Sequence, residues 1–291
     1  MNSLSIRHPW AGAFLDLALE GPCPEAVLRR EAGKAMDLAR FVQRLMSPHE
    51  EDSDLSRLNN CSWIAPLRVH PWTYQALIKA VTLSRETEGA FDITVRPKTV
   101  PGGPAGRHQA FTGLTEAGRW EDIELLPDCN VRFRRPLRMS LREMMTGFAM
   151  DKAIDYLSSR REITRAALKA DGEMRTCGEG PHPLPLAESK AGEPIAPPAI
   201  MLRPAVTTLP AWFARSPAGA HRAAPVIHPR TGKVMRSNYS VSVFSRTSME
   251  AGALVRAVLL SPQTLWNRLL KMHDSIALIL TTKGEQVLFP A

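Results

Sequence analysis

The chain has 291 residues, of which 44% are hydrophobic and 23% charged, and this composition excludes a wholly disordered protein. Its formal net charge is +8, but the Lys and Arg residues are spread along the chain and aromatic residues make up only 6%. Nucleic-acid binding, which needs a clustered basic surface with aromatic side chains for stacking, is therefore not expected. No segment approaches the roughly 20 apolar residues that span a bilayer, and no signal peptide or lipoprotein motif is seen. We expect a cytoplasmic protein without membrane insertion.

Strands and amphipathic helices follow one another irregularly in the first third of the chain. The apolar run at residues 13–19 predicts a strand, and apolar positions at three-to-four spacing predict a long helix over residues 24–46. Residues 47–61 are polar and predict a loop or a short capped helix. A second helix is expected over residues 70–87, with Gly89 as its C-terminal cap.

The middle of the chain is dominated by Gly and Pro. Residues 97–119 predict a long loop, and the alternating pattern of residues 120–133 predicts a hairpin. A helix over residues 147–161 and a strand over residues 165–169 follow. Residues 178–200 are so rich in Pro and Gly that we expect an exposed excursion there, and not a domain boundary.

The last third predicts mainly strands with one principal helix. An N-cap Ser or Thr opens that helix at residue 248. The order has no regular β-α-β-α rhythm, so we predict the α+β class and a single domain over residues 1–291. The predicted strands are 205–209, 224–227, 239–244, 275–281 and 286–289, and the predicted helices are 248–260 and 266–272.

Five segments resemble, in their order and spacing, the motifs of the ApbE-type flavin transferase family. Together they extend from about residue 11 to residue 290. The second of them, with its Phe-Asp-Ile-Thr-Val core, is the most specific. The segments are SPHEEDSDLSRLNN (47–60), EGAFDITVRP (88–97), MSLREMMTGFAMDKAIDYL (139–157), LKADGEMRTCGEGP (168–181) and VIHPRTGKVM (226–235) with the helix behind it.

The resemblance implies both a fold and an activity. The expected fold is the ApbE-like, T-fold-related layered α+β scaffold, which encloses a ligand cleft. The expected activity is that of an FAD:protein FMN transferase, which moves FMN from FAD onto a Ser or Thr of an acceptor flavoprotein. FAD as substrate and the acceptor flavoprotein are then the expected partners.

The resemblance also implies which residues bind FAD. Asp92 lies in an otherwise apolar run, where its carboxylate is expected to accept a hydrogen bond from the ligand or, alternatively, to make an N-cap or turn contact. His49 is expected to stack on a ring of the ligand or, equally, to be solvated. Asn59 has two amide ends that can hold either ligand or backbone. The remaining cofactor-binding positions that the resemblance implies are Ala90, Phe91, Thr146, Ile227 and Arg256.

The magnesium site of the family is altered in this sequence. The family binds Mg²⁺ with an Asp and, one helical turn later, a Thr, whereas this chain has Gly252 and Arg256, which cannot be ligands. We therefore predict that Arg256 neutralises the pyrophosphate directly through its guanidinium fork, the alternative being a surface arginine. Glu143 leaves a carboxylate near the altered site, so a displaced magnesium site with Glu143 as ligand is the other alternative.

The catalytic positions of the family are also changed. Its His corresponds to Pro225 and its Asp to His228, so we predict His228 as a relocated base, with a turn residue beside Pro229 as the alternative. Thr208 is retained from a family turn and is the second predicted catalytic residue. The sequence thus leaves two functions open: an active transferase, or a catalytically impaired FAD-binding or protein-binding paralogue.

Overall fold

A computed structural model describes most of the chain. Three predicted segments lie mostly outside the described residues. They are the loop over residues 97–119, of which residues 97–117 are not described, most of the 178–200 excursion, and the strand 224–227, of which only Val226 is described. The described residues are 1–10, 13–94, 118–170, 172–179, 183–184, 199–200, 203–209, 226, 228–229, 235, 237–281 and 285–290.

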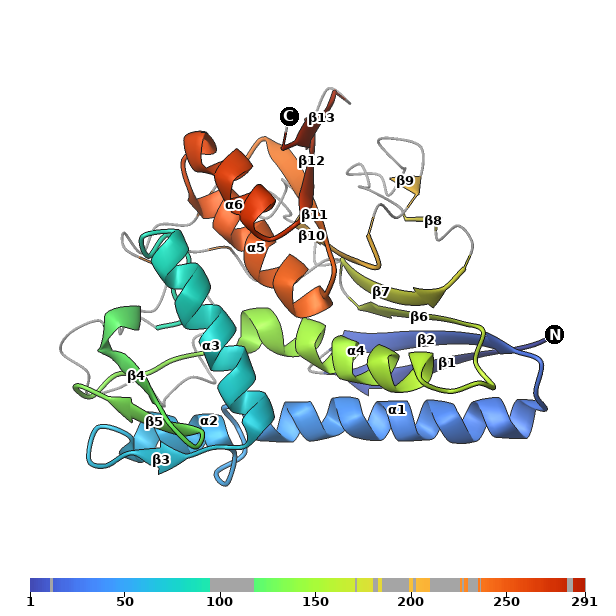
Figure 1. Ribbon diagram of the computed structural model, residues 1–291, viewed down its shortest axis with the longest axis horizontal. Helices are drawn as coiled ribbons and strands as arrows, with labels where there is room; N and C mark the ends of the chain where they lie inside the picture. Colours follow the sequence, from blue (N-terminus) through green and yellow to red (C-terminus); the bar gives the residue numbers. More distant parts are fainter. Residues whose placement is uncertain are drawn as a thin grey trace.

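An eight-stranded antiparallel sheet runs through the molecule in the order β1-β2-β6-β7-β10-β11-β12-β13 (Figure 1). Segments far apart in sequence meet in it, since β2 pairs with β6 and β7 pairs with β10. The strands are β1 (Asn2–Trp10), β2 (Ala13–Gly21), β6 (Arg165–Ala170), β7 (Glu173–Gly178), β10 (Ala205–Leu209), β11 (Tyr239–Ser245), β12 (Ile276–Thr281) and β13 (Gln286–Phe289).

Two smaller sheets accompany it. A three-stranded sheet has the order β3-β5-β4, and a short pair joins β8 to β9. The three-stranded sheet lies at the opposite end of the molecule from the N-terminus (Figure 1). Its strands are β3 (Leu67–Arg68), β4 (Ile123–Leu126) and β5 (Asn130–Phe133), and the short pair is β8 (Pro183–Leu184) and β9 (Ala199–Ile200).

The helices pack in two groups that meet where α4 crosses α5. The first group, α1 and α4, contacts β1, β2, β6 and β7, whereas α5 contacts β10 and β11. Helix α3 contacts both α1 and α5 and so joins the groups (Figure 1). The helices are α1 (Glu25–Met46), α2 (Asp54–Cys61), α3 (Pro71–Glu86), α4 (Arg142–Ser158), α5 (Ser248–Leu260) and α6 (Trp266–Met272), with short 3₁₀ turns η2 (Trp120–Asp122) and η3 (Gln263–Leu265).

Local sequence explains how these helices begin. Ser53 accepts a 3.0 Å hydrogen bond from the backbone N–H of Ser56 and so caps α2. The ring of His70 accepts from the N–H of Trp72 at 3.1 Å, and Pro71 occupies the first turn of α3, where its missing N–H costs nothing. Apolar residues at helical spacing along α1 are buried from Leu28 onward, which is the pattern of a helix that covers a sheet.

The α+β class predicted from the sequence is confirmed. Of the two alternatives for residues 47–61, the capped helix is correct, as α2. Strands β1 and β7 were not predicted, and α4 begins five residues before the predicted position, at Arg142 in place of residue 147. The run over residues 91–94 forms only an isolated bridge, between Thr94 and Met139.

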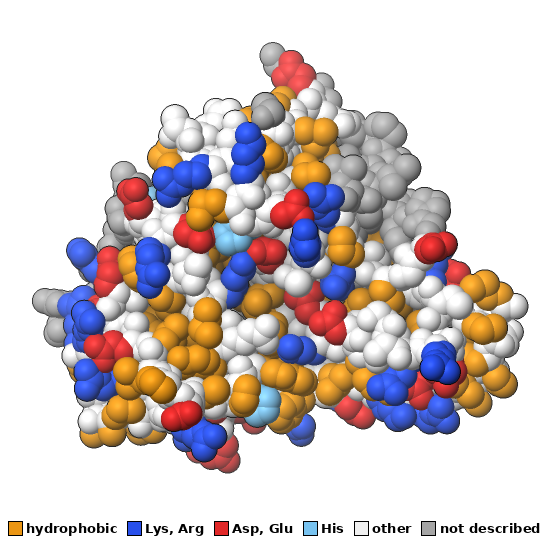
Figure 2. Space-filling view, viewed as in Figure 1, with side chains coloured by type: hydrophobic (Ala, Val, Ile, Leu, Met, Phe, Trp, Pro, Cys, Tyr) orange, Lys and Arg blue, Asp and Glu red, His pale blue; other side chains and the backbone are white. Residues whose placement is uncertain are grey.

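The surface carries no single dominant type of charge on the face drawn in Figure 2, where Lys and Arg side chains alternate with acidic ones. Hydrophobic side chains gather on this face over α3 and the neighbouring hairpin. Within the described part of the chain, no helix combines the length and the apolar character needed to cross a bilayer.

Candidate functional site

The segment that carries Asp92 follows a sharp reversal at the end of α3. Glu88 and Gly89 have positive φ angles of 52° and 75°, and the N–H of Gly89 closes the helix on the carbonyl of Ser84 at 2.7 Å. The chain then turns inward, where Phe91 is buried and its N–H donates to the Thr87 hydroxyl at 3.0 Å. The predicted glycine cap is thus confirmed, and it directs the next residues into the body of the protein.

Asp92 is half-buried and accepts hydrogen bonds at both carboxylate oxygens. The N–H of Thr94 donates at 2.9 Å and the N–H of Trp120 at 3.3 Å. Burial raises the pKa of the Asp92 carboxyl, and these hydrogen bonds only partly oppose that effect. The contact with Thr94 is a turn contact of the kind that the sequence left open. Each carboxylate oxygen retains a further lone pair, so Asp92 can also accept from a ligand.

Asn59 is buried and uses both ends of its amide on the backbone of Met139. Its Nδ2 donates to the Met139 carbonyl at 3.0 Å, and its Oδ1 accepts from the Met139 N–H at 2.9 Å. Of the two roles that the sequence left open, the structure therefore shows the backbone role. Because Thr94 also bridges to Met139, Asn59 fixes the strand-like segment against which the Asp92 turn lies.

The remaining residues predicted to bind FAD lie on several different segments. His49 is exposed between α1 and α2, and its N–H donates to the Ser47 hydroxyl at 3.1 Å. Ala90 is buried next to Phe91. The Thr146 hydroxyl accepts from the indole N–H of Trp10 at 3.2 Å. Ile227 lies outside the described residues.

The crossing of α4 and α5 was not predicted as a functional contact. Gly147 lies so close to α5 that a Cβ atom there would approach the carbonyl carbon of Ser248 to 2.5 Å. One turn later, Asp151 accepts from the N–H groups of Ser248 and Met249 at 2.7 and 2.9 Å. These two residues of the third family-like segment thus hold the first turn of α5 on α4.

Asp151 is the most deeply buried charge in this joint. Burial raises the pKa of its carboxyl to about 6, although the two backbone N–H donors and Arg175 favour the ionised form. The Arg175 guanidinium donates to Asp151 at 3.0 Å through Nε. The sequence contained a signal for this contact, since both Gly147 and Asp151 match the third family-like segment. No local sequence pattern, however, indicated that α5 packs against these two residues.

Arg256 lies on α5, two helical turns after Ser248 and on the same face as Ser248 and Gly252. Its Nη1 donates to the carbonyl of Gly252 at 3.0 Å, and its Nε forms an ion pair with the Glu143 carboxylate. Its side chain is only 20% exposed, so the surface-arginine alternative is incorrect. Burial lowers the pKa of the Arg256 guanidinium to about 10, and the positive charge of Arg142 acts in the same direction.

The residues at this position do not fit a magnesium ion. Gly252 offers no ligand, and a Cβ atom there would already lie 3.1 Å from the Glu143 carbonyl oxygen. The Glu143 carboxylate is paired with Arg256, a cation that would repel the metal. Among the described residues, no group of three or more His, Cys, Asp or Glu side chains is arranged to hold a metal ion.

The two predicted catalytic residues lie on different segments. The hydroxyl of Thr208, on β10, shares a 2.8 Å hydrogen bond with the hydroxyl of Ser242 on β11, and the Thr208 N–H donates to the Gly172 carbonyl at 2.8 Å. His228 is half-buried beside Pro229, in a stretch of which only some residues are described. Their catalytic roles stay predictions.

One backbone contact connects the Asp92 turn to the start of α4. The N–H of Ser140 donates to the carbonyl of Ile93 at 2.9 Å. Residues 139–143 therefore run from the partner of Asn59 past the Asp92 turn to Glu143, which binds Arg256. The segment 139–143 thus contacts both the Asp92 turn, through Ile93 and Thr94, and the altered metal position, through Glu143.

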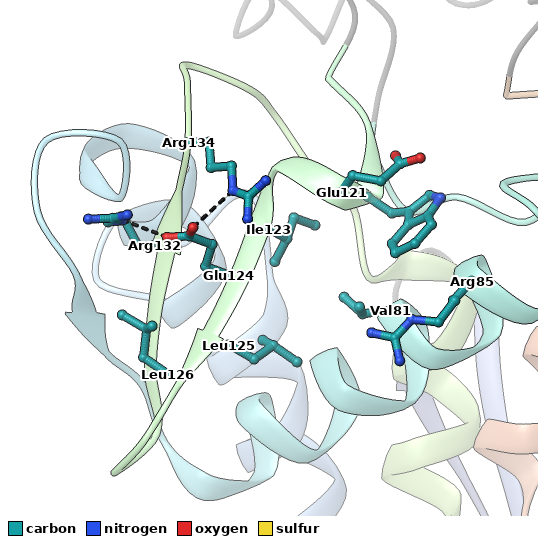
Figure 3. A pocket seen from close by; sticks show the side chains of 10 residues that line it. Val81, Arg85, Glu121, Ile123, Glu124, Leu125, Leu126, Arg132 and Arg134 are labelled. Atoms are coloured by element: carbon teal, nitrogen blue, oxygen red, sulfur yellow. Dashed lines mark hydrogen bonds and ion pairs between the residues drawn. The ribbon is translucent and has the colours of Figure 1, made fainter.

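A pocket of about 650 Å³ opens beside this region, between α3 and the β4–β5 hairpin (Figure 3). Apolar and charged side chains both line it, and Glu124 accepts hydrogen bonds of 2.7 and 2.9 Å from Arg132 and Arg134 (Figure 3). Trp120, whose backbone N–H donates to Asp92, is one of the lining residues. The lining residues are Val81, Arg85, Trp120, Glu121, Ile123, Glu124, Leu125, Leu126, Arg132 and Arg134.

Comparison with solved structures shows the same fold in known proteins. The ApbE protein from Thermotoga maritima matches with a TM-score of 0.78 at 18% identity, over 98% of this chain and 96% of that one. The flavin transferase ApbE from Vibrio cholerae matches with a TM-score of 0.73 at 20% identity, over 99% of this chain and 96% of that one.

Comparison of the sequences extends the likeness beyond the fold. An FAD:protein FMN transferase from Vibrio cholerae is 28% identical over 155 residues, which are 48% of this chain and 44% of that protein. The matched part thus spans less than half the length of this relative. The sequence model of the ApbE family matches residues 15–280, which is nearly the whole chain. The chain therefore belongs to the ApbE family.

Proposed function

We propose that this chain is an FAD:protein FMN transferase, which transfers FMN from FAD to a Ser or Thr of an acceptor flavoprotein. The name of the Vibrio cholerae relative supports this activity. The observation that carries the proposal is the segment 139–143, which is hydrogen-bonded to the Asp92 turn through Ser140 and paired with Arg256 through Glu143. This segment links the Asp92 carboxylate, a hydrogen-bond acceptor, to the buried Arg256 cation, and a ligand with polar ends and a charged centre needs both kinds of group.

The proposed reaction is a phosphoryl transfer. The acceptor hydroxyl oxygen forms a bond to the FMN phosphorus, the bond from that phosphorus to the bridging oxygen breaks, and AMP leaves with the electron pair. A base takes the hydroxyl proton, and we assign this role to His228, with Thr208 as the second catalytic residue. Asp92 accepts a hydrogen bond from a ligand N–H or hydroxyl, and Ala90 and Phe91 form the wall beside it.

The alternative of a catalytically impaired paralogue is not favoured, because the relative that matches in sequence is named as a transferase. Asn59 supports the FAD site from behind through Met139, whereas His49 and Thr146 are proposed to contact the ligand directly. We further propose that the chain meets its acceptor flavoprotein in the cytoplasm, and that residues 1–291 form one domain. Magnesium is not part of this proposal, since the residues at the altered position do not fit it.

Covalent transfer tests the activity directly. The purified chain is incubated with FAD and an apo-flavoprotein acceptor, and the acceptor is then denatured and separated on a gel. Flavin fluorescence that remains with the denatured acceptor, together with stoichiometric release of AMP, is the expected result. His228→Ala should lower the rate by about 100-fold or more, as removal of a general base does. AMP release without any bound flavin would contradict the transfer.

A further inference from the structure

The space next to Gly252 in the α4–α5 joint contains more positive than negative charge. Arg256 and Arg142 contribute two cations, and Glu143 contributes one carboxylate, which is paired with Arg256. Arg256 is mostly buried, so its charge is only weakly screened by water. The exposed Arg142 leaves this group of charges with one positive charge in excess, which favours the binding of an anion there.

The guanidinium of Arg256 is held in place but retains free donors. Nε is fixed by Glu143 and Nη1 by the carbonyl of Gly252, so the plane of the group is set by two contacts. The Nη2 group donates no hydrogen bond to any residue that the structure describes. An arginine has five N–H donors in a planar fork, and those left over here can bind phosphate oxygens.

A buried hydroxyl borders the same place. Thr207 is only 2% exposed, and its Oγ1 has no hydrogen-bond partner within the described part of the chain. A Cβ atom at Gly252 would lie 3.8 Å from this Oγ1, so the hydroxyl borders the position where Gly252 lacks a side chain. Buried polar atoms are rarely left without a partner, and an oxygen-rich ligand would supply one.

We propose that the fixed guanidinium of Arg256, supported by Glu143 and bordered by the Thr207 hydroxyl, binds the pyrophosphate of FAD in place of a divalent metal ion. The chain then binds FAD without magnesium. The inference rests on the proposed function, because it concerns the same ligand. It explains why Gly252 is tolerated: a metal-binding side chain at that position would press on the Glu143 carbonyl and would find a cation beside it.

The first test compares the affinity for FAD in buffer with EDTA and in buffer with Mg²⁺, using flavin fluorescence to monitor binding. The proposal expects the same affinity in both, within about twofold. A wild-type chain that binds FAD in Mg²⁺ and loses more than about tenfold affinity in EDTA would overturn the proposal and leave the proposed function intact. No FAD binding in either buffer would overturn the proposed function as well, so the two failures are distinguishable.

The second test uses Arg256→Ala and a matched control. The loss of a charge-assisted contact should lower the affinity for FAD and for ADP by at least about tenfold. Arg268→Ala removes the same charge from an exposed position on α6 and should change neither. Arg256→Lys, which keeps the charge, should restore part of the affinity.

Adenosine separates a phosphate contact from a purely structural role. It lacks phosphate, so Arg256→Ala should leave its affinity within about twofold of the wild-type value, measured by calorimetry on a variant shown to be folded by circular dichroism. An equal loss of affinity for adenosine and ADP would mean that Arg256 only shapes the site, and would overturn the proposal.

Discussion

The Asp151 carboxylate in α4 accepts a 2.7 Å hydrogen bond from the backbone N–H of Ser248, the first residue of α5. A second N–H, from Met249, donates to its other oxygen at 2.9 Å. The side chain of one helix thus satisfies two of the N–H groups that the next helix would otherwise leave unpaired. Because α5 also carries Arg256, this joint sets the position of the proposed phosphate contact.

We predict that Asp151→Ala destabilises the fold strongly. It leaves two buried N–H groups and the Nε of Arg175 without their acceptor, which costs about 2–4 kcal/mol in the free energy of unfolding. Urea denaturation measures the difference. Asp151→Asn keeps one acceptor oxygen and should lose less; equal stability of the alanine variant and the wild type would contradict the capping role.

The close approach of α4 and α5 predicts a steric effect at Gly147. In Gly147→Ala the new methyl group would meet the backbone of Ser248 at 2.5 Å, so the helices must separate, at a cost of about 1–3 kcal/mol. Gly33 in α1 is the control, since a Cβ atom there has no neighbour within 4 Å. Gly33→Ala should stabilise the chain by about 0.5–1 kcal/mol through helix propensity. The same change in unfolding free energy for both variants would contradict the packing described here.

His273 predicts a pH dependence of stability. Its ring lies between Glu250 and Glu86, at 2.9 and 2.7 Å, and Lys79 from α3 also contacts it at 3.1 Å. Burial and Lys79 lower the pKa of His273, but the two carboxylates outweigh them, so the pKa is raised from 6.5. Stability from this contact is therefore complete below the unfolded pKa and is lost as pH rises through the folded pKa.

The matching measurement compares the wild type with His273→Gln from about pH 5.5 to pH 9 by thermal unfolding, a range that brackets the ordinary histidine pKa. The advantage of the wild type in Tm should shrink as the pH rises. A constant difference across the range would show that His273 contributes through packing alone.

Much of the secondary structure follows from local pattern, as the agreement of α1, β10 and α6 with their predicted bounds shows. Strand β1 was missed although Leu4, Ile6 and Trp10 alternate with exposed residues, because the polar His8 and the neighbouring Pro9 interrupt its apolar pattern. Strand β7 buries Met174 and Thr176 between polar residues, which also weakens the signal. Strand β1 pairs with the next strand along the chain, β2, whereas β7 also pairs with the more distant β10, which a local pattern cannot contain.

The site was predicted in parts. The motif around Asp92 and the loss of metal ligands at Gly252 and Arg256 are visible in the sequence. The pairing of Arg256 with Glu143 depends on how α4 crosses α5, and the roles of Gly147 and Asp151 depend on the same crossing. Such contacts join residues about 100 positions apart, as the Asp151–Ser248 pair does, and sequence spacing alone does not specify them.

Titration of FAD into the wild type, Asp92→Ala and Asp37→Ala, monitored by flavin fluorescence, tests directly whether the chain binds FAD at Asp92. Asp37 is an exposed carboxylate on α1 and serves as the control for the loss of a charge. We expect saturable binding by the wild type and the Asp37 variant, and a loss of at least about tenfold in affinity for the Asp92 variant, since a ligand hydrogen bond to a charged group is removed. Absence of saturable binding by the wild type, or unchanged affinity in Asp92→Ala, would contradict this expectation.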